Sequence, residues 1–169
     1  MAEYLTVKAF EVIARSLSAA DVRFMVVGGV AMQAHGSDRL TYDLDIVVQL
    51  DPANVLRAFE ALKGAGYHPS VPIAASQFAD AQTRERFRRD KKMTVLNFWS
   101  DRVQQTKLDV FVAEPFDFDA EYALALRDES LLGIELRFPR AEILLQMKQR
   151  AGRPKDLHDI AYLENLLHR

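Results

Sequence analysis

The sequence of 169 residues contains no cysteine, which excludes disulfide bonds and thiolate zinc sites. It also lacks any apolar run near the roughly 20 residues that a membrane-spanning helix needs. The first residues mix polar and apolar side chains, without the continuous apolar core of a signal peptide. We therefore expect a cytoplasmic protein that does not contact a membrane.

A strong charge of either sign is also missing, since the formal net charge is −2 and the isoelectric point is near 6.1. Proteins that bind nucleic acid over a whole surface are usually basic, so this class is disfavoured, although a local basic patch remains compatible with the composition. Hydrophobic residues make up 49% and charged residues 27%, as in ordinary globular proteins. The length is that of one domain.

Helical and strand-like patterns alternate early in the chain, and helical patterns finish it. Helices are expected over 5–18, 30–35, 52–66, 117–126, 140–151 and 154–169, and strands over 22–27, 42–50, 93–100 and 107–113. Residues 76–92 predict a loop or an exposed helix, and 129–138 predict a small hairpin around Gly133. We expect an α+β fold with a small mixed sheet and flanking helices in 1–115 and a helical portion in 116–169, together forming one compact unit.

Two aspartates interrupt the apolar strand at 42–50, although aspartate is depleted in strands and costly to bury. Asp43 and Asp45 are two residues apart, so both project to the same side of a strand. Close carboxylates repel each other unless a proton or a cation lies between them. If the strand that carries Asp109 is a neighbour, three carboxylates converge, as two-metal phosphoryl chemistry requires. The alternative is that each aspartate caps an element or forms an ion pair.

A glycine pair, Gly28-Gly29, separates an expected strand from a short expected helix. Glycine allows the backbone to approach a ligand closely, and the amides at a helix start attract phosphate. On its own such a pair is usually only a turn. Its position one short helix before the aspartate strand favours a phosphate-binding interpretation.

These motifs resemble the nucleotidyltransferase superfamily with the DNA polymerase β-type fold. The resemblance consists of a glycine pair after a strand, a short helix, Thr-x-Asp-x-Asp on the next strand and a later aspartate, and it covers Val22 to Val112. Within the superfamily, the chain looks like small stand-alone bacterial enzymes, including those of toxin–antitoxin pairs and antibiotic-modifying enzymes. Many members have serine where this chain has Gly29.

The resemblance implies roles for specific residues. Asp43, Asp45 and Asp109 would be catalytic and would hold Mg²⁺ or Mn²⁺, and Asp109 would also orient or deprotonate the acceptor hydroxyl. The residues implied to contact the nucleotide in this part of the chain are Gly28, Gly29, Arg39 and Thr41.

Basic residues cluster near the C-terminus at Lys148, Arg150, Arg153 and Lys155, followed by Asp156 and Asp159. This segment resembles a helical part of the AbiEii-like toxin nucleotidyltransferases. The resemblance implies that Lys148 lies near the triphosphate and is ordered by an aspartate. The equally weighted alternative is a solvated helix start, because acidic residues suit the helix dipole there.

Two functions from different classes follow. The first is a metal-dependent enzyme that moves a nucleoside monophosphate from an NTP such as ATP to an acceptor hydroxyl on an RNA 3′ end, a protein or a small molecule. The toxin component of a toxin–antitoxin pair, with its cognate protein as partner, is one setting for it. The second is a catalytically weak nucleotide-binding partner or antitoxin subunit. The three aspartates favour the enzyme, and a metal-free α+β domain ranks third.

Overall fold

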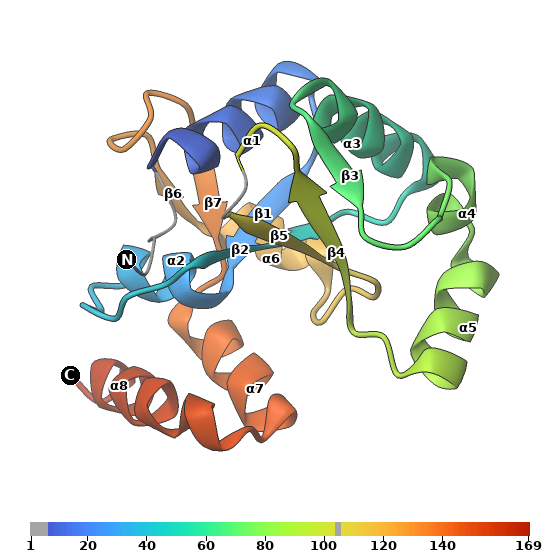
Figure 1. Ribbon diagram of the computed structural model, residues 1–169. Helices are drawn as coiled ribbons and strands as arrows, with labels where there is room; N and C mark the ends of the chain where they lie inside the picture. Colours follow the sequence, from blue (N-terminus) through green and yellow to red (C-terminus); the bar gives the residue numbers. More distant parts are fainter. Residues whose placement is uncertain (1–6, 104–105) are drawn as a thin grey trace.

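The computed structural model describes residues 7–103 and 106–169, and a five-stranded mixed sheet forms its centre (Figure 1). The strands, in the order β1-β2-β5-β4-β3, are β1 (Phe24–Val27), β2 (Asp43–Val48), β5 (Lys107–Phe111), β4 (Val95–Ser100) and β3 (Tyr67–Pro69). The central pair, β2 and β5, is parallel, and the other neighbours are antiparallel. The expected mixed sheet with flanking helices is confirmed.

Helices surround this sheet. They are α1 (Val7–Ala19), α2 (Gly28–Ala34), α3 (Pro52–Gly64), α4 (Ala75–Ala79), α5 (Ala81–Lys91), α6 (Phe118–Leu124), α7 (Ala141–Ala151) and α8 (Leu157–Leu167). A 3₁₀ turn, η1 (Pro154–Asp156), precedes α8, and a separate two-stranded ladder joins β6 (Leu126–Asp128) to β7 (Leu136–Phe138). Leu5, in the first expected helix, lies outside the described residues. No helix in the described ranges is long and apolar enough to cross a membrane.

Aspartate caps define where several helices begin. The Asp51 carboxylate accepts a hydrogen bond from the Asn54 amide at 3.3 Å, and Pro52 stands in the first turn of α3. The Asp80 carboxylate accepts from the Thr83 amide at 2.9 Å at the start of α5. Such caps satisfy amides that have no partner within the helix. The same residue type therefore has a purely structural task at the helix starts.

The two faces of the sheet differ in polarity. Alternate residues of a strand face opposite sides, so Leu44 and Ile46 of β2 point one way and Asp43 and Asp45 the other. Leu44 and Ile46 belong to the main core, which is closed by apolar residues of α1 and α3. Figure 1 shows α1 and α3 above the sheet, and α7 and α8 below it.

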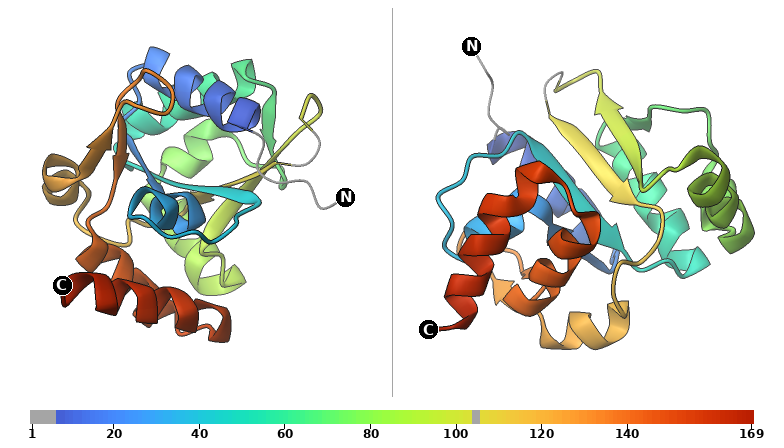
Figure 2. Two further views of the ribbon diagram at one scale, coloured as in Figure 1. Left: turned by 90° about the vertical axis from the view of Figure 1, so that its left-hand side faces the viewer. Right: turned by 90° about the horizontal axis from the view of Figure 1, so that it is seen from below.

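The second face is apolar only in part. A small cluster of Met25, Val27, Val47 and Phe118 covers one end of it, with Met147 of α7 packed against the cluster. The other end carries the aspartates of β2 and β5. The right panel of Figure 2 shows α7 and α8 in front of the sheet on the side of β1 and β2. The described C-terminal helices thus lie over the polar face.

The structure shifts or completes several local expectations. The helix expected from residue 30 begins at Gly28, so the glycine pair forms the first two helical residues. Residues 76–92, expected as a loop or an exposed helix, form helices α4 and α5. The expected hairpin around Gly133 is present as the antiparallel ladder of β6 with β7, but its first strand begins at Leu126 and not at residue 129. Strand β3 was not expected from the sequence, because it has three residues and ends in Pro69, which an edge strand tolerates.

Candidate active site

A row of residues across the sheet brings the aspartates together. The strand register aligns Val27, Asp45, Asp109 and Asn97 on β1, β2, β5 and β4. Asp45 stands directly opposite Asp109 in the parallel pair, and Asp43 precedes Asp45 by two residues. All three carboxylates therefore project from the same face. Convergence of the three aspartates required β2 and β5 to be neighbours, and they are.

Crowding of the carboxylates changes their protonation. Burial, together with the charges of Asp109 and Asp43, raises the pKa of Asp45 from 3.8 to about 6. Burial also raises the pKa of Asp109, and Asp43 adds to that effect. The charged form of both carboxyl groups is thus disfavoured, and a bound cation would stabilise it.

The donor chemistry of this group fits a hard divalent cation. Carboxylate oxygens are the ligands that Mg²⁺ prefers, together with water and substrate phosphates. Across the described ranges, no three histidine, cysteine, aspartate or glutamate side chains are already arranged to hold an ion. Asp43 is exposed at the strand start and Asp45 is half-buried. Because these carboxylates are not already arranged around one point, binding a cation would require their side chains to turn toward it.

Asn97 is a site residue that was not expected from the sequence. Its side-chain amide donates a short hydrogen bond to Oδ1 of Asp109, which opposes the upward shift in the pKa of that carboxyl group. Asn97 alternates with buried Leu96 and Phe98 on β4, so it faces the same side as Asp109. Alternation alone could have marked Asn97 as polar and outward. The pairing of β4 with β5 was needed to assign it to the site.

The glycine pair packs against the aspartate strand. Gly28 has a φ of +65°, and a Cβ atom there would lie 2.2 Å from Oδ2 of Asp45. A Cβ atom at Gly29 would lie 2.6 Å from both Cβ and Oγ1 of Thr41. The hydroxyl of Thr41 donates to the backbone carbonyl of Asp43 at 3.1 Å. Because α2 starts against Asp45 and Thr41, the packing leaves no room for a Cβ atom at either position and so requires glycine at both.

A buried ion-pair network forms where α7, η1 and α8 meet. Nζ of Lys148 lies 2.7 Å from Oδ2 of Asp159 and 3.4 Å from Oδ1 of Asp156. Arg39 also pairs with Asp159, and Arg153 pairs with Asp156 at 2.7 Å. The side chains of Lys148, Asp156 and Asp159 are only 8%, 2% and 3% exposed. A solvated helix start does not describe these three residues.

The network acts electrostatically on the carboxylates of the sheet. Lys148 and Arg153 lower the pKa of Asp45, against the larger effect of burial. Lys155, which is exposed, lowers the pKa of Asp109 in the same way. The structure therefore brings the basic C-terminal segment near the aspartate face. Arg150 lies elsewhere and donates to the carbonyl of Pro115 at 3.1 Å.

A hollow in the surface lies away from these residues. It is lined by Gln49, Asp51, Arg84, Arg88 and Glu114, among others, and so borders the segments that follow β2 and β5. Asp43 stands at the opposite end of β2. The hollow is therefore not the place where the three aspartates meet.

No protein-family model matches this chain, and no curated protein matches its sequence. Among solved structures, the chain is similar to the crystal structure of an antigenic nucleotidyltransferase-like protein from Paracoccidioides brasiliensis. The two chains are 21% identical, with a TM-score of 0.55, and the match covers 95% of this chain and 75% of that one. Together with the sheet order and the flanking helices, this likeness shows that the chain has a nucleotidyltransferase-like fold.

Proposed function

We propose that this chain is a metal-dependent nucleotidyltransferase that moves a nucleoside monophosphate from an NTP to an acceptor hydroxyl. One observation carries the proposal: Asp45 stands directly opposite Asp109, with Asp43 on the same face of the same strand. Burial and mutual repulsion raise the pKa of Asp45 and of Asp109, so this face favours a cation.

Each part of the site has a task in this proposal. Asp43, Asp45 and Asp109 would hold Mg²⁺ or Mn²⁺, which when bound neutralises charge on the transferring phosphoryl group. Lys148 and Arg153 add positive charge beside Asp45. The remaining residues proposed to shape the nucleotide site are Gly28, Gly29, Arg39 and Thr41.

The proton of the acceptor hydroxyl needs a base. As the acceptor oxygen bonds to the α-phosphorus, the bond from that phosphorus to the bridging oxygen breaks and pyrophosphate leaves. Asp109 takes the proton, and its raised pKa makes it a better base than an ordinary carboxylate. The hydrogen bond from Asn97 keeps the Asp109 carboxylate oriented.

Calorimetric titration with each NTP and Mg²⁺ tests the proposal, together with transfer of label from the α-phosphate. Wild type should bind the nucleotide with its metal and transfer the label. Asp45→Asn should weaken this binding at least roughly tenfold and abolish transfer, because the change removes one charge and little volume. Asp101→Asn, on the exposed turn after β4, is the matched control. Unchanged metal–nucleotide binding by Asp45→Asn contradicts the proposal.

The second candidate function is a catalytically weak nucleotide-binding partner or antitoxin subunit. It is favoured by Lys148, whose ammonium group is already paired with two buried carboxylates. NTP binding without transfer to RNA, protein or small hydroxyl compounds would support this candidate.

A toxin role of the active enzyme has a separate test, which is expression of wild type and of Asp45→Asn in cells. This role predicts growth arrest with wild type alone.

A further inference from the structure

Trp99 is the only tryptophan of the chain, and 49% of its surface is exposed. The imidazole of His68 lies beside it, with ring centroids 5.3 Å apart and a tilt of 49°. Residues of β4 alternate between the two faces, so Trp99 lies on the same face as Asn97, whose amide reaches Asp109. An exposed aromatic pair therefore shares the face of the carboxylates.

The order of the strands separates this pair from the proposed triphosphate site. The glycine pair follows β1, and the aspartates stand on β2 and β5. Trp99 and His68 lie farther along the sheet, on β4 and β3. The aromatic pair is thus on the far side of Asp109 from the glycine pair, next to the group proposed to take the acceptor's proton.

This half of the face is open and carries an exposed lysine. In the right panel of Figure 2, none of the described helices lies in front of β4 and β5. Lys107 of β5 is exposed and stands directly opposite Asp43 of β2. Because Leu108 pairs with Phe98, Lys107 is level with Trp99 on its other side. One cationic group, Lys107, therefore stands between Trp99 and Asp43.

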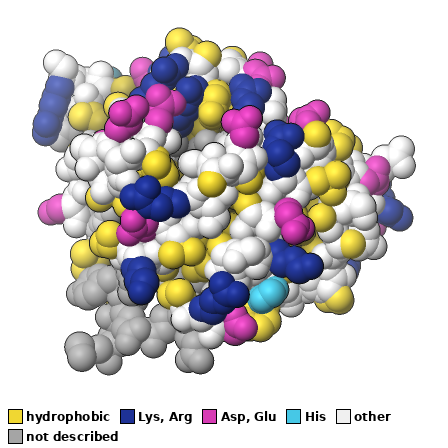
Figure 3. Space-filling view, turned by 90° about the horizontal axis from the view of Figure 1, so that it is seen from above, with side chains coloured by type: hydrophobic (Ala, Val, Ile, Leu, Met, Phe, Trp, Pro, Cys, Tyr) yellow, Lys and Arg dark blue, Asp and Glu magenta, His cyan; other side chains and the backbone are white. Residues whose placement is uncertain are grey.

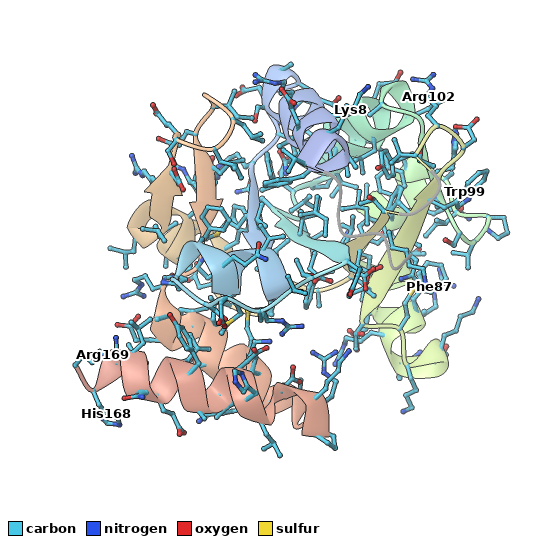
Figure 4. All side chains as sticks on the ribbon, turned by 60° about the vertical axis from the view of Figure 1, so that its left-hand side comes forward. Lys8, Phe87, Trp99, Arg102, His168 and Arg169 are labelled. Atoms are coloured by element: carbon cyan, nitrogen blue, oxygen red, sulfur yellow. The ribbon has the colours of Figure 1, made fainter. Side chains whose placement is uncertain are left out.

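A basic helix, α5, leads into β4. Arg88 and Arg89 of this helix pair with Glu85 and Asp90. Arg86, Lys91 and Lys92 form no ion pair with a carboxylate of the described residues, and all three are exposed. Figure 4 shows Phe87 of α5 and Trp99 on the same side of the molecule, away from the C-terminal Arg169. By contrast, basic and acidic side chains are interspersed on the face seen in Figure 3.

We propose that Trp99 and His68 form a stacking platform for an unpaired base of a single-stranded nucleic acid, whose terminal 3′ hydroxyl is the acceptor. The use of this 3′ hydroxyl as the acceptor rests on the proposed function. Aromatic rings that stack bases, next to cations that follow the backbone, are how proteins bind single strands without reading their sequence. RNA and DNA share this chemistry.

Because Trp99 is the sole tryptophan, its fluorescence reports directly on this site. Wild type is titrated with RNA and DNA oligonucleotides of the same sequence, with heparin as a polyanion without bases, and with NTP and Mg²⁺. Oligonucleotides should quench the emission at moderate salt, whereas heparin and NTP should not. The stronger quencher of the two oligonucleotides identifies RNA or DNA as the source.

Three variants test the platform by fluorescence anisotropy of a labelled oligonucleotide. Trp99→Ala should weaken binding roughly tenfold or more, and Trp99→Phe should weaken it less because a ring remains. Leu56→Ala on α3 removes a side chain of similar exposure, 46%, from another element and should bind as wild type does. Melting temperatures confirm that each variant is folded.

The platform is overturned if heparin or NTP quenches as strongly as the oligonucleotides, or if Trp99→Ala binds as tightly as Leu56→Ala. NTP binding that depends on Asp45, without any oligonucleotide binding, refutes the platform alone. Oligonucleotide quenching without NTP binding refutes the proposed transfer reaction and leaves the platform intact.

Discussion

Asp45 lies between two other carboxylates on a partly covered sheet face, and this position links its charge to stability. Its pKa of about 6 exceeds the ordinary 3.8, so the folded protein binds this proton more tightly than the unfolded chain does. The stabilisation is complete below pH 3.8 and is lost as the pH rises through about 6. In the metal-free protein at neutral pH, the ionised Asp45 therefore no longer contributes this stabilisation to the folded state.

Asp45→Asn should remove this loss. At pH 8 without metal, we expect the variant to exceed wild type in free energy of unfolding by up to about 3 kcal/mol, with the difference vanishing near pH 4. Urea unfolding at both pH values measures it. Mg²⁺ should stabilise wild type and not the variant at pH 8. The same pH dependence in both proteins would show that Asp45 is not the group involved.

Gly29 is tightly enclosed, since a Cβ atom there would lie 2.6 Å from that of Thr41. We expect Gly29→Ala to lower the free energy of unfolding by about 1–3 kcal/mol, because backbone or strand must shift. Gly64→Ala is the matched control, since a Cβ atom there meets nothing within 4 Å. That change should stabilise α3 by roughly 0.5–1 kcal/mol. Thermal unfolding compares the two, and equal effects would contradict the packing argument.

At the scale of elements, α7, η1 and α8 are joined by charges that water barely reaches. Lys148 of α7 bridges Asp156 of η1 and Asp159 of α8. Removing one partner of a buried pair leaves the other charge uncompensated, which costs more than the pair contributes. Arg39 and Arg153 pair with the same two aspartates and would limit the cost.

Lys148→Ala should therefore lower both stability and nucleotide affinity. We expect a loss of about 3 kcal/mol in unfolding free energy and a higher Michaelis constant for NTP. Lys155→Ala removes the same charge from an exposed position and should change stability by less than about 0.5 kcal/mol. Chemical denaturation and initial-rate kinetics provide both readouts. Indistinguishable variants would mean that the network matters neither for the fold nor for the site.

The strands that carry the aspartates could be predicted from sequence because their residues are β-branched and apolar over several positions. The site could be predicted in part, since the spacing of Asp43 and Asp45 already sets their shared direction. Their pairing with Asp109 depends on strand order, which alternation does not encode. Asn97 and the contacts of Lys148 required the same long-range information. β3 was missed because three residues ending in proline carry too little pattern.

For the whole molecule, the C-terminal helices are attached to the sheet by apolar packing, such as that of Met147, and by a few polar contacts. The Tyr162 hydroxyl donates to the carbonyl of His35 at 2.9 Å, and Nε2 of His35 lies 2.7 Å from the carbonyl oxygen of Pro139. Arg39 reaches Asp159 from the segment before β2. These contacts connect α8 and the start of α7 to the end of α2, beside the carboxylate face.

Nucleotide should therefore tighten the attachment of α7 and α8. Phosphate charge beside Lys148 and Arg153 would add contacts between the helices and the sheet face. We expect NTP with Mg²⁺ to slow amide hydrogen exchange in 141–167 by several-fold, measured by mass spectrometry. Exchange in α3, on the other face, serves as the internal control. Protection confined to α3, or absent in both, would contradict this arrangement.

The parallel pairing of β2 with β5 also has a kinetic consequence. Asp45 and Asp109 become neighbours only when segments more than sixty positions apart in the chain find each other. Closing such a long loop costs entropy before any strand contact compensates, so pairings of this kind tend to form slowly. During refolding, helical circular dichroism should return before the carboxylates meet. During that interval the helices are formed, but the chain cannot bind a cation between Asp45 and Asp109 because these carboxylates are still apart.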